Sequence, residues 1–141
     1  MIEYKYCIDD VLPKQLSGFF IDWPDPPDRE THYKILKNSS YIVLAIDTET
    51  NNLIGFINAI SDSILCSYIP LLEVLPSYQG KGIGNELVKR MMDQLQNLYM
   101  IDIVCDENLK SFYNRHGFNV YSCMIKRNYT KQSGKTDVIS V

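Results

Sequence analysis

The sequence predicts a single α/β domain in which helices pack on a β-sheet. Residues 41–46 and 53–60 are apolar runs separated by turn residues, a pattern typical of a β-hairpin. Residues 84–98 repeat apolar side chains every three or four positions, which is the period of a helix that lies on a sheet. The 141 residues are enough to bury one full core, and they leave no room for a second domain.

The N-terminal third predicts a strand, two helices and a stiff loop. Residues 2–8 alternate apolar and polar side chains and predict a strand, and residues 11–20 predict a helix. Residues 22–28 contain three prolines, so they predict an irregular acidic and aromatic loop. Residues 29–37 then predict a short helix with Asp28 as its N-cap.

The rest of the chain predicts further strands and helices in alternation. Residues 64–75 form a long β segment interrupted by Pro70, which fits a bulge or a local loss of pairing. The remaining predicted elements are a strand over 101–105, a helix over 108–116 closed by Gly117, and a strand over 118–125. We expect residues 1–129 to form the domain and residues 130–141 a flexible tail.

The composition argues against several classes of protein. The net charge is -3 and the pI is 5.3, with no sustained basic face, so a dedicated nucleic-acid binder is not expected. The four cysteines are far apart, form no CxxC pair and have no histidines at metal-ligand spacing, so we expect no metal. Three of them lie in apolar runs, and we expect these to be core thiols. Residues 1–6 lack a charged segment followed by an apolar stretch, and no run approaches the length of a membrane span, so we expect no leader, no membrane-spanning segment and a cytoplasmic location.

A glycine-rich segment joins the strand before it to the helix over 84–98. Its sequence is Gln79-Gly80-Lys81-Gly82-Ile83-Gly84. Three glycines at every second position allow a tight turn and expose N–H groups at the positive end of a helix, which predicts a phosphate cradle. The spacing of the Walker loop does not occur here. The dinucleotide fingerprint does not fit either, because Asn85 stands where that fingerprint needs its third glycine.

Together with its flanks, this segment resembles the GNAT superfamily of acetyl-CoA-dependent N-acetyltransferases. The flanks are Val74 and Pro76 upstream, and Phe112-Tyr113 followed by Gly117-Phe118 downstream. The resemblance extends over residues 53–118. It implies a mixed, mostly antiparallel central sheet with splayed middle strands and helices on both faces.

The resemblance also implies which residues bind and react. For acetyl-CoA they are the backbone of the splayed strand, the glycine segment and two residues of a later loop, namely Leu72, Val74, Gln79, Gly80, Lys81, Gly82, Ile83, Gly84, Asp106 and Asn108. The family commonly has Asn at the position of Asp106, whereas glucosamine-phosphate N-acetyltransferases also have Asp there. A turn or capping role for Asp106 competes evenly with a ligand role. Tyr113 matches the family's tyrosine acid, which serves the leaving thiolate.

The general base and the acceptor site are less determined by the sequence. Glu73 is the only carboxylate on the splayed strand, so it is the candidate base, acting through a water, and its alternative is a structural carboxylate. Phe20, Trp23 and Tyr68 are the candidates for binding the acceptor, and packing of the loop onto the core is the alternative for Trp23.

We therefore expect an enzyme that transfers an acetyl group from acetyl-CoA to a primary amine, in a ternary complex and without metal. The small size and the acidic loop favour a small-molecule acceptor. Two alternatives stay open: a CoA-binding module without turnover, and an enzyme that acetylates proteins or peptides. The sequence also leaves open whether the chain is a monomer or a homodimer.

Overall fold

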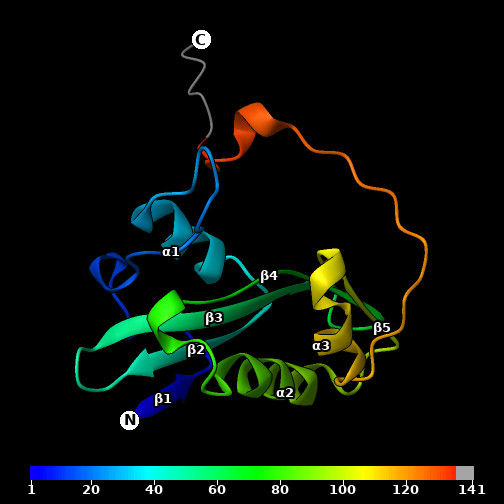
Figure 1. The fold of residues 1–141 in the computed structure, drawn as a ribbon, viewed down its shortest axis with the longest axis horizontal. Helices are drawn as coiled ribbons and strands as arrows, with labels where there is room; N and C mark the ends of the chain where they lie inside the picture. Colours follow the sequence, from blue (N-terminus) through cyan, green and yellow to red (C-terminus); the bar gives the residue numbers. More distant parts are fainter. Residues whose placement is uncertain (136–141) are drawn as a thin grey trace.

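A computed structural model describes residues 1–135, which form one five-stranded sheet with helices on both of its faces (Figure 1). The strands follow one another across the sheet in chain order, as β1 (Ile2–Lys5), β2 (Tyr41–Asp47), β3 (Asn52–Ser61), β4 (Cys66–Val74) and β5 (Met100–Ile103). Neighbouring strands are antiparallel except β4 and β5, which are parallel. The predicted mixed, mostly antiparallel sheet is confirmed.

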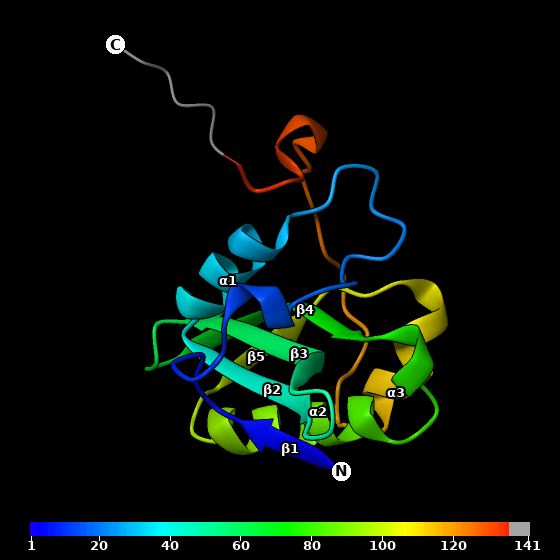
Figure 2. The same ribbon diagram turned by 90° about the vertical axis from the view of Figure 1, so that its left-hand side faces the viewer.

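Helices α1 (Arg29–Lys37) and α2 (Ile83–Leu95) lie on opposite faces of this sheet, as Figures 1 and 2 show. Helix α3 (Lys110–Asn114) follows β5 and continues a 3₁₀ turn over Glu107–Leu109. Three other 3₁₀ turns are Pro13–Gln15, Pro76–Tyr78 and Tyr129–Lys131. No helix within residues 1–135 is long and apolar enough to cross a membrane.

The core consists of two apolar layers separated by the sheet, because side chains alternate along each strand. Val43 and Ala45 of β2 belong to the layer that contains Leu87 of α2. Leu44 belongs to the opposite layer with Leu36 of α1. A strand buried on both faces reads as a continuous apolar run, which explains why the pattern over residues 41–46 shows no alternation with polar residues.

The predicted helix starts have clear local causes. The Asp28 side chain accepts a hydrogen bond from the Thr31 N–H at 2.8 Å, so the predicted N-cap of α1 is confirmed. That bond and the ammonium group of Lys135 lower the pKa of Asp28 to about 2. Helix α2 buries its periodic apolar residues on the sheet, as predicted, and it begins one residue earlier than expected.

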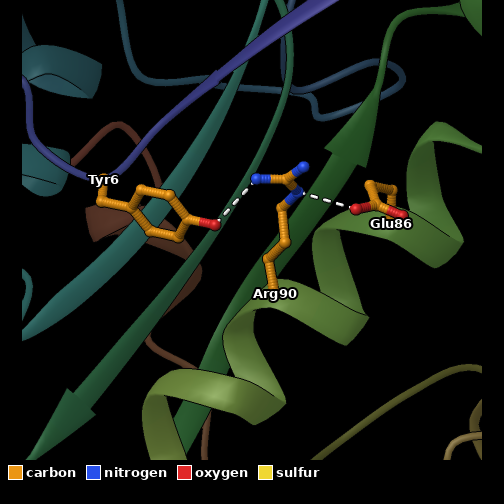
Figure 3. A network of polar contacts seen from close by, with 3 residues as sticks. All are labelled: Tyr6, Glu86 and Arg90. Carbon is orange, nitrogen blue, oxygen red and sulfur yellow. Dashed lines mark hydrogen bonds and ion pairs between the residues drawn. The ribbon is translucent and has the colours of Figure 1, made fainter.

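Side chains also connect the first strand to α2 (Figure 3). Arg90 donates to the Glu86 carboxylate at 2.7 Å and to the Tyr6 hydroxyl at 2.9 Å. Its guanidinium lies over the Tyr4 ring, 4.3 Å from the ring centroid. These contacts hold the edge strand β1 and the residue that follows it against the helix.

The predicted helix over residues 11–20 is wrong. Only the 3₁₀ turn Pro13–Gln15 is regular there, and Gly18 and Phe20 have the left-handed φ values of 92° and 63°. Gln15 accepts from the Leu12 N–H and donates to the Asn51 carbonyl, so a side chain satisfies backbone groups that a helix would pair. The apolar residues of this segment still enter the core, which explains the misleading pattern.

The strand predicted over residues 64–75 begins only at Cys66. Asp62 accepts hydrogen bonds from the N–H groups of Ile64, Leu65 and Cys66, and these bonds lower its pKa to about 2. A carboxylate that gathers three successive N–H groups fixes a turn instead of a strand. The first strand is likewise shorter than the predicted residues 2–8.

The predicted strand over residues 118–125 is also wrong for the single chain. Residues 118–128 have no regular structure, and residues 119–131 are exposed. Residues 136–141, most of the predicted tail, lie outside the described residues. Of the rest of that tail, Gln132 accepts from the Asp25 N–H at 2.8 Å and Lys135 pairs with Asp28 at 3.0 Å. The flexible tail stays a prediction.

Helix α1 contains a buried histidine that packs against aromatic side chains. His32 of α1 is 1% exposed, and neither ring nitrogen has a hydrogen-bond partner among the described residues. Its ring packs against Phe19, Phe20 and Phe56 with centroid distances of 4.5–5.2 Å. Desolvation disfavours the charged imidazolium and lowers the pKa of His32 to about 4.

This environment predicts an acid-sensitive contribution to stability. Below pH 6.5 the unfolded chain binds a proton that folded His32 takes up only near pH 4, so stability falls between these two values. The loss totals about 3 kcal/mol, at 1.36 kcal/mol for each pH unit. In urea unfolding at pH 7 and pH 4, we expect His32→Leu to lose about 3 kcal/mol less than the natural chain. Equal losses in the two proteins would contradict this account.

Candidate active site

The strands β4 and β5 separate partway along β4. Their pairing joins Cys66–Ile69 to Met100–Ile103 and stops there, while β4 continues to Val74 paired with β3 alone. Pro70 is the first residue beyond the pairing and has no N–H to donate. The loss of pairing predicted around Pro70 is confirmed, and it leaves one side of β4 open.

The orientation of the backbone shows which groups line this open side. The Leu71 N–H donates to the Asn58 side chain at 3.1 Å, and the Leu75 N–H donates to the Ile54 carbonyl at 2.8 Å, so both point toward β3. Successive residues of a strand point their backbone groups to alternate sides. The N–H groups of Leu72 and Val74 therefore face the open side, where an extended ligand chain can add to the sheet as another strand.

The glycine segment lies between β4 and α2. Gly80 and Gly82 have φ values of 77° and 80°, a left-handed conformation that an L side chain rarely adopts. Gly82 is the N-cap of α2 and contributes no capping side chain. Within residues 1–135 the N–H groups of Ile83 and Gly84 have no acceptor, since the Glu86 N–H is the one that bonds back to Gly82. This is a local site for an anion at the positive end of a helix.

Residues outside the glycine segment hold it in place. The Gln79 side chain donates to the Val74 carbonyl at 3.0 Å. Tyr78 donates to the Asp47 carboxylate at 2.5 Å, a bond that lowers the pKa of Asp47 and raises the pKa of Tyr78. The Lys81 ammonium lies 5.4 Å from the centroid of the Tyr78 ring. The hairpin between β2 and β3 thus anchors the segment through Asp47.

A large cavity opens beside the exposed half of β4. Its volume is about 1170 Å³, slightly above the usual range for small-molecule sites. The predicted site residues that line it are Phe20, Trp23, Leu72, Glu73, Val74, Gln79, Asp106, Asn108 and Tyr113. Its described lining includes neither Tyr68 nor residues 80–84, although residues 80–84 directly follow Gln79. Residues from separate parts of the chain therefore meet at one cavity.

Tyr113 reaches the cavity from α3. It is 6% exposed and packs against Phe112 and Phe118, with centroid distances of 4.9 and 5.8 Å. Burial raises the pKa of Tyr113 to about 12. Its hydroxyl has no hydrogen-bond partner within residues 1–135. At neutral pH the side chain is a neutral phenol that is free to donate into the cavity.

Glu73, which also lines the cavity, holds residues 19–28, here called the aromatic loop. Its carboxylate accepts from the Phe20 N–H at 2.7 Å and from the Ile21 N–H at 3.3 Å. Phe20 and Asp22 both have left-handed φ values, 63° and 65°, which are unfavourable for residues with side chains. The two charge-assisted bonds help to stabilise this conformation. The Phe20 ring in turn packs against Trp23 with a centroid distance of 4.9 Å.

Asp106 and Asn108 border the cavity at the start of the segment that leads into α3. Asp106 is the N-cap residue of the Glu107–Leu109 turn, but its side chain makes no capping hydrogen bond. The Asp106 side chain therefore does not have the capping role that the sequence left open as an alternative. Both residues are exposed and present polar side chains to the cavity.

Sequence reasoning missed the contribution of the C-terminal segment. Ile125, Arg127 and Tyr129 also line the cavity, and Arg127 brings a positive charge to a wall that holds Asp22 and Glu73. No local pattern links these residues to the cavity, because their segment follows α3 and passes through a long stretch without regular structure before the turn Tyr129–Lys131 (Figure 1). Among residues 1–135 no group of three or more His, Cys, Asp or Glu side chains is arranged to hold a metal.

Comparison with known proteins gives consistent matches. The model of the acetyltransferase (GNAT) family matches residues 8–118. The uncharacterized N-acetyltransferase ycf52 of the alga Pyropia yezoensis is 32% identical over 87 residues, which are 59% of this chain and 50% of that protein. The chain thus spans about half the length of the curated relatives it matches.

Solved structures match over nearly the whole chain. A crystal structure from Deinococcus radiodurans R1, of a protein provisionally assigned as an acetyltransferase, is 40% identical with a TM-score of 0.93. That match covers 96% of this chain and 94% of the other. A GNAT family acetyltransferase from Streptococcus pneumoniae TIGR4 is 27% identical with a TM-score of 0.68, and the match covers 91% and 98% of the two chains.

The geometry around Glu73 predicts that this residue is needed for the conformation of the aromatic loop. Glu73→Ala leaves the Phe20 and Ile21 N–H groups without their acceptor, so we expect a loss of about 1–3 kcal/mol in unfolding free energy. Hydrogen exchange at these two amides should accelerate. Glu3→Ala, a change of an exposed carboxylate on β1, is the matched control and should leave exchange there unchanged. Slow exchange at Phe20 in Glu73→Ala would show that other contacts hold the loop.

Proposed function

The chain belongs to the acetyltransferase (GNAT) family, and on that premise we propose that it transfers the acetyl group of acetyl-CoA to a primary amine, directly and within a ternary complex. The observation that carries this proposal is the open side of β4 between the glycine segment and Tyr113. Val74 of that open side and Tyr113 line one cavity, and Gln79, the first residue of the glycine segment, lines it as well. Bound acetyl-CoA supplies an acetyl group activated as a thioester.

The residues present fit this co-substrate. The unpaired N–H groups at the start of α2 suit a pyrophosphate, and the positive charge of Lys81 lies in the same segment. The Leu72 and Val74 N–H groups have no partner strand on their open side, so they are available to an amide-containing arm. Asp106 and Asn108 supply further polar groups at the cavity wall.

The chemistry requires the site to stabilise an oxyanion and to protonate sulfur. A carbon–nitrogen bond forms and the carbon–sulfur bond breaks, so the amine loses a proton and the thiolate gains one. We assign oxyanion stabilisation to the N–H of Val74, which already faces the cavity. We assign protonation of the thiolate to the hydroxyl of Tyr113, which stays protonated at neutral pH because its pKa is about 12.

The acceptor amine is proposed to bind beneath the aromatic loop. Phe20 and Trp23 give this wall aromatic faces, and Asp22 and Glu73 give it negative charge, a combination that suits an amine that arrives as a cation. Several separate segments of the chain line the cavity, among them residues between 125 and 132, and a recess built in this way favours a small molecule over a folded protein. Glu73 positions the loop in this proposal, and its role as a base through a water stays a prediction.

The binding half of the proposal is tested at Gly82. Gly82→Val places a β-branched residue at a φ of 80°, so the segment must change conformation and move the N–H groups of α2. By isothermal titration, we expect the affinity for acetyl-CoA to fall at least about tenfold. Gly117→Val is the matched control, since Gly117 has a φ of 90° and equally open surroundings outside the segment. Unchanged affinity in Gly82→Val would refute the anion site.

The catalytic half is tested at Tyr113 with an assay of thiol release over a panel of amines, amino acids, polyamines and peptides. Tyr113→Phe keeps the ring and removes the proton donor, so we expect kcat to fall about 100-fold while the Kd for acetyl-CoA is unchanged. In the natural enzyme, deprotonation of Tyr113 should not reduce activity below about pH 11. Tyr41→Phe, which removes a hydroxyl bonded to Ser63, is the control.

The same assay separates the alternatives that the sequence left open. Binding of acetyl-CoA without turnover on any amine would favour a CoA-binding module. Turnover on peptides alone would favour acetylation of proteins. A Tyr113→Phe enzyme with full kcat would remove that residue from the mechanism and leave the rest of the proposal intact.

A further inference from the structure

Two side chains of opposite charge line the cavity without pairing with each other. Asp22 belongs to the aromatic loop, and Arg127 belongs to the segment that follows α3. The Asp22 carboxylate makes no hydrogen bond or ion pair within residues 1–135. The Arg127 guanidinium makes only a long hydrogen bond, at 3.4 Å, to the carbonyl of the neighbouring Lys126. Among the described residues, each of these charges therefore lacks a counter-charge.

The segments that carry these two charges lie next to each other. The Asp25 N–H of the aromatic loop donates to the Gln132 side chain at 2.8 Å. Figures 1 and 2 both show the turn Tyr129–Lys131 beside this loop. A single cavity can therefore receive both Asp22 and Arg127, although more than 100 positions separate them in the sequence.

The aromatic loop gives Asp22 a defined position. Its backbone has a left-handed φ of 65°, a conformation that Asp tolerates better than most residues with a side chain. The residue before it, Ile21, is held by the Glu73 carboxylate. Glu73 also accepts from the Phe20 N–H, so its oxygens are already used within the protein. Asp22 is the carboxylate that remains available to a ligand on this loop.

A pair of opposite charges selects a ligand that carries both signs. A plain ammonium ion is attracted by Asp22 and repelled by Arg127, whereas a molecule with an ammonium and an anionic group is attracted by both side chains. A guanidinium can also donate two parallel hydrogen bonds to a carboxylate or a phosphate. The rings of Phe20 and Trp23 line the same cavity and suit the apolar part of such a molecule.

We propose that the acceptor is an amine that also carries a carboxylate or a phosphate, with Asp22 attracting the amine and Arg127 binding the anionic group. This inference rests on the proposed acetyl transfer and narrows its acceptor to one chemical class. Arg127 then determines specificity, and polyamines, which carry positive charge alone, are poor acceptors. Acetylation removes the positive charge of the amine, so the product loses its attraction to Asp22 and is released more easily than the acceptor.

The test compares amines in matched pairs whose members differ only by the anionic group. The pairs are phenylalanine with 2-phenylethylamine, lysine with cadaverine, and phosphoethanolamine with ethanolamine. Affinity is measured by isothermal titration with CoA in place of acetyl-CoA, so that no transfer occurs. In at least one pair we expect the anion-bearing member to bind at least about tenfold more tightly. The pairs also distinguish a carboxylate from a phosphate. Equal affinity in every pair, preference for the plain amines, or no binding by any compound overturns the proposal.

Variants assign the preference to Arg127. Arg127→Gln should weaken binding of the anion-bearing member at least about tenfold without weakening its plain partner, and Arg127→Glu should reverse the preference. Lys126→Gln removes the neighbouring exposed cation, which does not line the cavity, and should keep the preference. An unchanged far-UV circular dichroism spectrum shows that each variant is folded. A preference that persists in Arg127→Gln overturns the proposal.

A second pair of variants tests the other charge. Asp22→Asn should weaken both members of a pair, because both carry the amine. Asp25→Asn, at an exposed carboxylate of the same loop that does not line the cavity, is the matched control and should bind both members normally. Unchanged affinities in Asp22→Asn would refute the role of this carboxylate.

Binding and turnover separate this inference from the acetyl transfer itself. Titrations that give the expected preference, without thiol release on the same compounds, would support the charge pair and refute the transfer. Thiol release that is equally efficient on both members of every pair would support the transfer and refute the charge pair.

Discussion

The end of the pairing between β4 and β5 is the constraint on which the site depends. Two parallel strands that stay paired along their whole length bond to each other's backbone N–H and C=O groups and leave none of these groups for a ligand. Pro70 has no N–H on the side where β5 would continue, so the ladder stops at Ile69 while β3 still holds the rest of β4. The fold can tolerate this break because β3 still pairs with β4 beyond it, from Leu71 to Val74. Glu73, Gln79 and Tyr113 line the cavity beside the resulting opening.

The opposite faces of the sheet contribute different parts of the chemistry. The face that packs on α2 contributes the glycine segment, held by Gln79 and by the bond between Tyr78 and Asp47. The face that packs on α1 contributes the aromatic loop, held by Glu73. Glu73 therefore connects β4 to the aromatic loop, and its two hydrogen bonds help to offset the unfavourable backbone of Phe20 and Asp22.

Residues 118–125 are a segment in which the sequence pattern and the structure of the single chain disagree. A helix satisfies its backbone within one segment, but a strand requires a neighbour, so a strand pattern is fulfilled only where the fold or a partner supplies an edge. In residues 118–125 the pattern is present, but these residues pair with no strand within residues 1–135.

The sequence by itself determined the elements whose causes are local. Asp28 caps α1, the glycine turns precede α2, Pro70 ends a ladder, and the apolar period of α2 fixes its buried face. With the family's motifs, these features were enough to predict the sheet, the helices on both faces and the residues of β4, α3 and the aromatic loop that line the cavity. Only the tertiary structure decided what depends on distant partners. Residues 11–20 form no helix, and the Gln15 side chain donates a hydrogen bond to the Asn51 carbonyl instead. The Glu73 carboxylate accepts a hydrogen bond from the Phe20 N–H, and Arg127 lines the cavity. Such contacts join residues that are far apart in the sequence, so the local pattern around each residue does not predict them.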